Sequence, residues 1–453
     1  MSVYSAPLDD MRFTLREIVG FDKIAALPGF DGTDQELTDQ ILEEAGKFSR
    51  DVLAPLNEVG DKEKARLENG VVRPVPGFSD AYSQFWQGGW NAMPFEEEFG
   101  GQNLPVSLTM AVWEMWNSAN LAFALCPLLT QAGIEAMTKH ASAEQKEKYL
   151  HKLVSGEWTG TMNLTEPQSG TDLGAIRTRS ERKGDHYLLK GQKIFITWGD
   201  HDMTDNIVHL VLARSPDGPP GSKGLSLFIV PKFLVNDDGS LGARNDVRPV
   251  SLEEKLGIHA SPTCVMSYGD NEGAVAYLIG EENRGIEYMF VMMNNARLGV
   301  GLQGLAIAER AYQQAVAFSR DRVQSRAIQG SDGPVAIIQH PDVRRMLLGM
   351  KSQIEGMRGL CYYTAAEIDR ANREEALEKR ARAQRRVDLM IPVVKSWCTD
   401  TGLAITSTNI QIHGGMGFIE ETGAAQHYRD ARITTIYEGT NGVQAMDLIG
   451  RKV

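Results

Sequence analysis

The chain has 453 residues, of which 42% are apolar and 23% charged, an ordinary balance for a globular protein large enough to hold several structural units. Its net charge of −12 argues against non-specific nucleic-acid binding, because that function needs a basic surface. The first residues, Met1 to Pro7, lack a basic stretch followed by an apolar one, so no secretory signal is expected, and no apolar run looks long enough to span a membrane.

From about residue 33 to 158 the spacing of apolar residues predicts helices. Asp34 is placed to cap the first of them, and Ser142 with Gln145 forms the pattern of a capping box at another. The apolar, methionine-containing stretch 107–129 predicts a single buried helix. The glycine-containing stretch 98–103 predicts a turn between two helical regions.

The pattern changes at about Thr161, where short apolar runs alternate with turn-forming residues. Residues 186–197 predict two strands joined by a turn at Lys190-Gly191. Further strands are predicted at 207–213, 225–230, 247–252, 264–268 and 274–279. Short strands at regular spacing indicate a small antiparallel barrel or sandwich.

Helical spacing returns at about residue 286, with long periodic segments at 297–325 and 341–368 and a further one at 392–407. Residues 367–386 carry many charges of both signs, which predicts a solvated helix face. The chain order is therefore helices, strands and helices, without an internal repeat. The four cysteines show no metal-ligand or CxxC spacing, so we expect reduced thiols, no metal site and a cytoplasmic location; they are Cys126, Cys264, Cys361 and Cys398.

Near the C-terminus, one carboxylate stands in an apolar run closed by turn formers, Ile436 to Gly442. Burial would raise the pKa of Glu438, because it disfavours the charged form. A carboxylate with such a pKa suits a general base that removes a weakly acidic C–H proton. The alternative is an exposed glutamate that begins a terminal helix.

Two other segments indicate a cofactor with a polar ring. Residues 162–172 offer hydroxyl groups and glycine-permitted backbone N–H groups, which suit a flavin, although a polar interdomain loop has the same composition. Strand alternation would place Phe195 and Thr197 on one face, where an aromatic ring and a hydroxyl could stack on and bond to a flavin. A half-buried strand without a ligand is the alternative.

Together these segments resemble the acyl-CoA dehydrogenase family, and the resemblance runs from about residue 35 to the end. The motifs fall in the order found in that family, and their flanking residues resemble its long branch: Thr165-Glu166-Pro167, Gly170-Thr171-Asp172, Lys193 to Thr197, Lys255-Leu256-Gly257, Gln411 to Gly417, Arg429-Asp430-Ala431 and Tyr437 to Thr440.

The resemblance implies a mainly helical protein with a central β-domain. Its divisions would be an N-terminal extension (1–34), an N-terminal helical domain (35–160), a small antiparallel β-barrel with flavin contacts (161–282) and a C-terminal four-helix bundle with the catalytic base (283–453). The implied reaction is the FAD-dependent α,β-dehydrogenation of an acyl-CoA thioester to trans-2-enoyl-CoA. Glu438 would remove the α-proton, while the β-hydrogen leaves as hydride to flavin N5. The ribityl hydroxyl and the Glu438 backbone N–H would polarise the thioester carbonyl.

The resemblance also implies roles for individual residues. Cofactor contacts within the subunit would come from Met162, Leu164, Thr165, Gly170, Thr171, Phe195, Thr197 and Thr440. Contacts to a neighbouring subunit's FAD would come from Arg322, Gln411, Gly414 and Gly415. Substrate contacts would come from Thr171, Arg297, Tyr437 and Gly439.

Alternatives remain for several of these positions. Arg322 next to Asp321 could be a solvated arginine, the glycine pair a plain turn, and Arg297 a partner in a surface salt bridge. The chain also departs from the family pattern in three places. Ser325-Arg326 stands where relatives often have Phe-Gly, Asn441 to Gln444 replaces Ser-x-Gln, and the chain stops at Val453 where the long branch usually continues with helices.

The resemblance implies an acyl-CoA substrate, electron transfer to an electron-transfer flavoprotein, a homo-oligomer (dimer or tetramer) and a place in fatty acid β-oxidation. Two alternatives stay open: an acyl-CoA oxidase of the same fold, and a non-catalytic DNA-associated relative. Glu438 and the acidic net charge count against the second. The length of the acyl chain is not fixed by the sequence, because one methylene changes binding by only about 1–3 kcal/mol.

Overall fold

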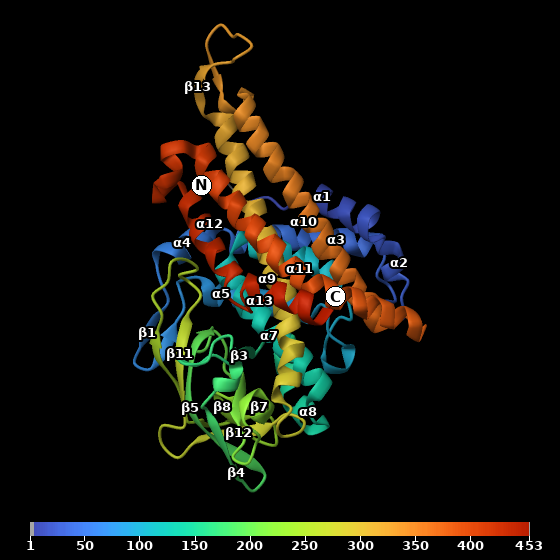
Figure 1. Cartoon of the computed structure of the whole chain (residues 1–453), viewed down its shortest axis with the longest axis vertical. Helices are drawn as coiled ribbons and strands as arrows, with labels where there is room; N and C mark the ends of the chain where they lie inside the picture. Colours follow the sequence, from blue (N-terminus) through green and yellow to red (C-terminus); the bar gives the residue numbers. More distant parts are fainter. Residues whose placement is uncertain (1–3, 453) are drawn as a thin grey trace.

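The computed structural model describes residues 4–452, in which helices, a β-barrel and long helices follow one another (Figure 1). This order confirms the predicted fold class. The first three residues of the stretch inspected for a secretory signal lie outside the described range.

The N-terminal region is helical, with one small β-hairpin. Its caps confirm two predictions: the Asp34 side chain accepts a hydrogen bond from the Leu37 N–H at 2.8 Å, and Ser142 and Gln145 form a reciprocal capping box. The elements are α1 (Leu8–Phe13), α2 (Phe21–Ala25), α3 (Gln35–Phe48), α4 (Pro55–Lys62), β1 (Arg66–Glu68), β2 (Val71–Arg73), α5 (Phe78–Gln87), α6 (Val106–Ala119), α7 (Leu121–His140) and α8 (Ala143–Ser155).

The stretch predicted as a single buried helix is in fact two, α6 and α7. The chain leaves helical geometry at Asn120, whose side chain accepts the Phe123 N–H at 3.0 Å and so caps α7. Helix α7 is long and apolar enough to span a membrane, with a mean hydropathy of 1.3. The expectation that no apolar run is long enough was therefore wrong. However, 89% of its apolar window is buried inside the protein, as expected for a core helix.

The central region is a β-barrel. Strands β5, β12, β7, β6 and β4 pair in succession, and β4 returns to β5, so the five strands form a ring. Strands β11 and β10 extend the sheet from β5, and β3 pairs in parallel with β6. The strands are β3 (Thr159–Asn163), β4 (Arg179–Lys183), β5 (His186–Thr197), β6 (Ile207–Arg214), β7 (Leu225–Pro231), β8 (Phe233–Val235), β9 (Leu241–Arg244), β10 (Val247–Leu252), β11 (Thr263–Tyr268) and β12 (Ala274–Leu278).

The prediction of two strands joined by a turn at Lys190-Gly191 was wrong, because β5 runs unbroken through that dipeptide. Its first half pairs with β4 and β12, and its second half pairs with β11. Gly191 marks the change of partner. A methyl group there would lie 2.4 Å from the Thr178 hydroxyl oxygen, so only glycine permits the close approach of the two backbones.

The C-terminal region contains three long helices, α9 (Gly285–Asp321), α10 (Pro341–Arg373) and α11 (Leu377–His413), which pack against one another. Helix α9 runs from the barrel towards the opposite end of the molecule, where the hairpin of β13 (Val323–Arg326) and β14 (Pro334–Ala336) projects (Figure 1). The helix predicted to continue to residue 325 therefore ends earlier. The short helices α12 (Ala424–Ala431) and α13 (Asn441–Asp447) complete the region.

The charge-rich segment 367–386 is not simply the solvated face that its composition predicts. Glu367 and Asp369 are each only 1% exposed. The Asp369 carboxylate accepts the N–H groups of Val106 at 2.7 Å and Ser107 at 3.0 Å, so α10 supplies the cap for the start of α6. Asp369 is therefore buried instead of solvated, because the N-terminus of α6 stabilises its negative charge.

The close crossing of α9 and α11 depends on glycines on both helices. A methyl group at Gly304 would lie 2.3 Å from the Cys398 carbonyl oxygen, and one at Gly402 would lie 2.4 Å from the Gly304 carbonyl oxygen. Gly301 is similarly close to Val394. The two backbones therefore touch, and the side chains that flank the crossing are brought close together.

We expect Gly304→Ala to lower the free energy of unfolding by about 1–3 kcal/mol, because the added methyl must push α9 and α11 apart. Gly349 of α10 is the matched control: no heavy atom lies within 4 Å of its missing Cβ. Gly349→Ala should stabilise the protein by up to about 1 kcal/mol through helix propensity. Thermal unfolding of both variants measures the contrast, and equal melting temperatures would contradict the account of the crossing.

Candidate active site

The predicted base, Glu438, lies on the short connection between the 3₁₀ turn Arg432–Thr435 and α13. Glu438 and Gly439 both have positive φ, 55° and 87°, so the connection turns sharply. The Gln444 side-chain amide donates to the carbonyl of Glu438 at 3.4 Å and to that of Gly439 at 3.2 Å, while the Thr440 hydroxyl caps α13. Thr440, predicted to contact the cofactor, thus also has a structural partner.

The Glu438 side chain keeps some exposed surface but has protein atoms on most sides. This burial raises the pKa of Glu438 to about 7, although the positive charges of Arg297 and Lys395 act in the opposite direction. The carboxylate is therefore poised to gain or lose a proton near neutral pH, as a general base requires.

Arg297 and Tyr437, two predicted substrate contacts, lie beside Glu438. Arg297 is 5% exposed, and its nearest ion-pair partner is Asp447 of α13, at 3.6 Å. The salt bridge considered for Arg297 therefore exists, but it is buried rather than on the surface. The Tyr437 hydroxyl donates to the side-chain oxygen of Gln303 on α9.

The loop that follows β3 is fixed by the buried carboxylate of Glu166. It accepts hydrogen bonds from the Lys193 ammonium at 2.8 Å and from the N–H groups of Arg177 at 2.7 Å and Thr178 at 3.0 Å. Lys193 also donates to the Leu164 carbonyl at 2.9 Å. Burial raises the pKa of Glu166, but its partners lower it more, so the carboxylate stays charged.

Phe195 occupies a β-bulge rather than a regular strand position. The register between β5 and β11 shifts between Lys193 and Ile196, and Phe195 has φ 59° with 58% of its surface exposed. The assumed alternation therefore does not hold through this segment, because a bulge adds a residue and redirects the side chain. The Ile194 N–H bonds to the Thr165 carbonyl at 2.9 Å, which holds the bulge beside the loop.

The other predicted contacts near this loop differ in exposure. Thr165 and Thr197 are half-buried, whereas Gly170 and Thr171 are exposed. Leu164 belongs to the apolar core shared by helices and barrel strands, and Met162 packs against that core. An exposed aromatic ring beside two accessible hydroxyls fits a flat ring system with polar edges, so these residues fit a flavin.

A second group of predicted cofactor residues lies at the far end of α9. Arg322, Gln411, Gly414 and Gly415 are all exposed. The stacking of Phe318 on His413, with ring centroids 4.2 Å apart, brings their segments together. This group lies about 37 Å along α9 from Arg297, because an α-helix rises 1.5 Å per residue. Within one subunit, the structure does not bring it to Glu438.

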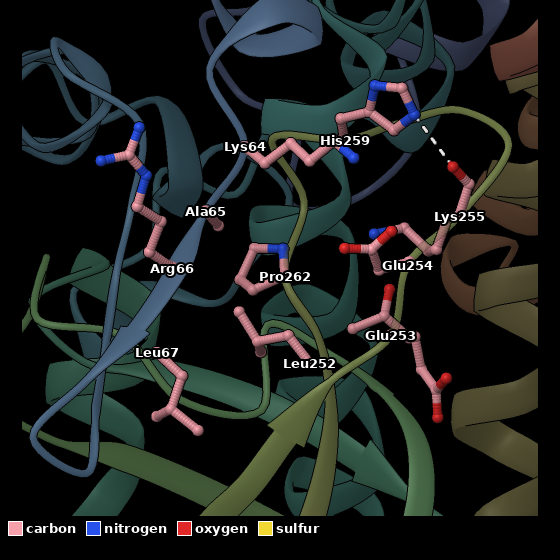
Figure 2. Close-up of a pocket in the computed structure, with 11 residues that line it drawn as sticks. Lys64, Ala65, Arg66, Leu67, Leu252, Glu253, Glu254, Lys255, His259 and Pro262 are labelled. Carbon is pink, nitrogen blue, oxygen red and sulfur yellow. Dashed lines mark hydrogen bonds between the residues drawn. The ribbon is translucent and has the colours of Figure 1, made fainter.

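A cavity of about 280 Å³ lies elsewhere, between the hairpin β1–β2 and the connection from β10 to β11 (Figure 2). Two of its polar side chains, His259 and Lys255, already have structural partners. His259 bonds to the Lys255 carbonyl at 2.9 Å and pairs with Asp61 of α4 at 3.0 Å, while Arg429 of α12 pairs with Asp61 from the other side. The cavity therefore belongs to the junction of the three regions, and none of the predicted site residues lines it.

Sequence inspection missed three residues around the base: Lys395, Asn441 and Gln444. The available signal was that Lys395 directly follows the apolar run Ile391 to Val394 of α11, where a residue on the apolar face of the helix is buried. Asn441 and Gln444 appeared only as departures from the family pattern. Their contacts depend on the path of the turn, which spacing does not reveal.

The chain matches known proteins over most of its length. Models of the acyl-CoA dehydrogenase N-terminal, middle and C-terminal domains match residues 35–157, 161–270 and 283–453. The chain is 50% identical over 452 residues to 3-methylmercaptopropionyl-CoA dehydrogenase of Ruegeria pomeroyi, covering 99% of this chain and 76% of that protein. These matches confirm the resemblance that the sequence motifs indicated.

Two solved structures share the fold. Butyryl-CoA dehydrogenase from Megasphaera elsdenii is 28% identical, with a TM-score of 0.74 over 93% of this chain and 99% of that one. A chain in a structure of the electron transferring flavoprotein of Acidaminococcus fermentans is 27% identical, with a TM-score of 0.75 over 92% and 98% of the two chains.

We expect Lys193→Met to destabilise the protein by about 3–5 kcal/mol at neutral pH, because it leaves the buried Glu166 carboxylate without its counter-charge. The loss should shrink as pH falls towards 4, since Glu166 can then accept a proton and become neutral. Lys190→Met, at an exposed position of the same strand, should stay within about 0.5 kcal/mol of the wild type. Chemical unfolding across this pH range tests the assignment, and a pH-independent loss would contradict it.

Proposed function

The chain belongs to the acyl-CoA dehydrogenase family, and we propose that it oxidises an acyl-CoA thioester to trans-2-enoyl-CoA with Glu438 as the base that removes the α-proton. The observation that carries this proposal is the Glu438 carboxylate, whose pKa is raised to about 7 by burial on a sharp turn. A carboxylate of ordinary pKa would be a much weaker base for a C–H bond.

The chain's own groups would divide the work around the substrate. The Glu438 carboxylate would take the proton, and the positive charges of Arg297 and Lys395 favour its charged form. The Glu438 backbone N–H would polarise the thioester carbonyl, which makes the α-proton more acidic. Tyr437 and Gly439 flank the base, and Tyr437 is held by its bond to Gln303.

The cofactor proposed for this site is FAD, which when bound would accept the β-hydrogen as a hydride. Phe195 would cover one face of the ring system, and the hydroxyls of Thr165 and Thr197 would bond to its polar edge. The Lys193–Glu166 pair supports this arrangement by fixing the backbone on which Thr165 sits.

We also propose a homo-oligomer, a dimer or a tetramer, in which Arg322, Gln411, Gly414 and Gly415 contact the FAD of a neighbouring subunit. Their exposure and their separation from Glu438 support this division. An arginine fork suits the geometry of a pyrophosphate. We also propose that the protein passes electrons to an electron-transfer flavoprotein, lies in the cytoplasm and serves fatty acid β-oxidation. An oxidase of the same fold would instead consume oxygen.

We expect Glu438→Gln to retain FAD but to lose bleaching of the flavin spectrum by acyl-CoA, by at least a thousandfold in rate, because no group remains to take the α-proton. In the wild type, bleaching should accelerate as pH rises and level off above about 7, when Glu438 is ionised. Glu421→Gln, at an exposed glutamate, is the control. Normal bleaching by the glutamine variant would refute the assignment. A panel of acyl-CoAs with an artificial acceptor would then define the chain length.

We expect Arg322→Ala to weaken FAD retention at least tenfold, because a charged hydrogen bond to phosphate contributes about 1.5–3 kcal/mol. Arg320→Ala removes another exposed arginine from the same end of α9 and should retain FAD normally. The ratio of flavin to protein absorbance after gel filtration measures FAD retention in both variants. Light scattering measures the mass of each variant and so its oligomeric state. A monomer with full FAD content and activity would contradict the shared site.

A further inference from the structure

Lys395 of α11 is a buried lysine next to the proposed base. Its side chain is 0% exposed, and its ammonium donates a hydrogen bond to the Asn441 side-chain oxygen at 2.8 Å. Glu438 and Asp400 are the carboxylates whose charge acts on it. A buried ammonium is costly unless other groups compensate it, so its position calls for a reason.

Asn441 is held in the orientation that this contact needs. Its amide nitrogen donates to the Asp400 carboxylate at 2.8 Å and to the Thr399 hydroxyl at 3.0 Å, so its oxygen is directed towards Lys395. Asn441 is also the first residue of α13, three positions after Glu438. The contact therefore ties the turn that carries the base to α11.

That turn needs support, because its backbone is strained. A glutamate with φ 55° lies in the left-handed region, which costs about 1–2 kcal/mol for a residue with a Cβ. Gln444 holds the turn from its C-terminal side through the carbonyls of Glu438 and Gly439. Lys395, through Asn441, holds it from the side of α11.

We propose that Lys395, held by Asn441, is a positioning residue that stabilises the Glu438 carboxylate and fixes the turn that presents it. This inference rests on the proposed role of Glu438 as the base. Arg297 is the other cation near Glu438, but it also pairs with Asp447 at 3.6 Å, so part of its charge is compensated. Lys395 instead bonds directly to a neutral amide oxygen, and Glu438 and Asp400 are the carboxylates on which its charge acts.

The charged groups around the base come from four elements. Arg297 lies on α9, Lys395 and Asp400 on α11, Asp447 at the end of α13, and Arg451 just beyond it. Burial lowers the pKa of Lys395 to about 8, so the ammonium is charged at neutral pH. Removing it should leave Glu438 with less support for its charged form.

The test is the pH profile of kcat/KM for Lys395→Met, compared with Lys395→Arg. The acidic limb is the part of this profile in which kcat/KM rises with pH as Glu438 loses its proton. The methionine variant should shift its midpoint upwards by about one pH unit, because an opposite charge nearby lowers a carboxyl pKa by about that much or more. It should lose about tenfold in rate below pH 6.5 and recover at high pH. The arginine variant should keep the wild-type limb. A purely structural role would lower the rate equally at all pH values.

Lys232→Met is the matched control, because Lys232 is also a buried lysine, paired with Asp200 in the barrel at 2.8 Å. It should lower the melting temperature without moving the acidic limb. Should Lys395→Met fail to fold, Asn441→Ala takes its place. That variant keeps the charge but releases it, so the acidic limb should move upwards by a smaller amount.

A second readout does not depend on activity. Melting temperatures of the wild type, Lys395→Met, Glu438→Gln and the double variant form a cycle that measures the coupling of the two residues. Coupling should be present at pH 7.5, where Glu438 is largely ionised, and absent at pH 5, where it is protonated.

The outcomes separate this inference from the proposed function. Bleaching by Glu438→Gln would overturn the base assignment itself. An inactive Glu438→Gln together with an unmoved limb in Lys395→Met, or in Asn441→Ala if that variant replaces it, would leave the base in place and overturn the role of Lys395. Coupling that is equal at pH 5 and pH 7.5 would also overturn it.

Discussion

The close crossing of α9 and α11 is the constraint on which the candidate site depends. Glycine at positions 301, 304 and 402 lets the two backbones touch. Arg297 precedes the crossing on α9 and Lys395 lies beside it on α11, so both cations face the same turn. With larger residues at the crossing, the helices would separate and the cations would withdraw from Glu438. Helix packing thus decides the electrostatics of the proposed base.

The buried charges elsewhere in the chain show why Glu438 stands apart. Arg358 of α10 bonds to Glu114 and Glu309, and Lys193 bonds to Glu166. These groups form direct ion pairs, which hold elements together and keep the charges fixed. Among the described residues, Glu438 has no direct ion pair. Its two nearby cations bond to other groups: Arg297 pairs with Asp447, and Lys395 donates to the Asn441 side-chain oxygen. A carboxylate supported in this looser way keeps a pKa near neutrality and can exchange a proton.

Much of the fold could be predicted from the sequence, because apolar spacing and caps act locally. The capping box at Ser142 and the order of helices, strands and helices are examples. The errors arose where distant contacts decided the structure. Asn120 divides two helices that share one apolar run. The continuity of β5 through Gly191 depends on Thr178, the residue before β4. The motifs point to the proposed base and to the loop proposed for the flavin, but the residues that support them are set by packing between elements far apart in the chain.

Several residues other than glycine have a strained backbone with positive φ. Positive φ at Asn69, Asn103 and Asn283 is expected, since asparagine tolerates it. Trp198 and Ile258 also have positive φ, but both are buried, and the Ile258 N–H bonds to Asp430 at 2.5 Å, so tertiary contacts offset the strain.

Phe195 and Glu438 differ from these residues. Phe195 is 58% exposed, so its ring adds little to the apolar core. Burial disfavours the charged form of Glu438 and raises its pKa to about 7. Neither side chain therefore offsets the strain of its own backbone. Strain that the fold does not offset is a property of functional positions. Three described positions fit this description: Phe195, Glu438 and the exposed Ser325 of the β13–β14 hairpin. Of these, Phe195 and Glu438 are the ones that a flavin and its substrate would have to engage together.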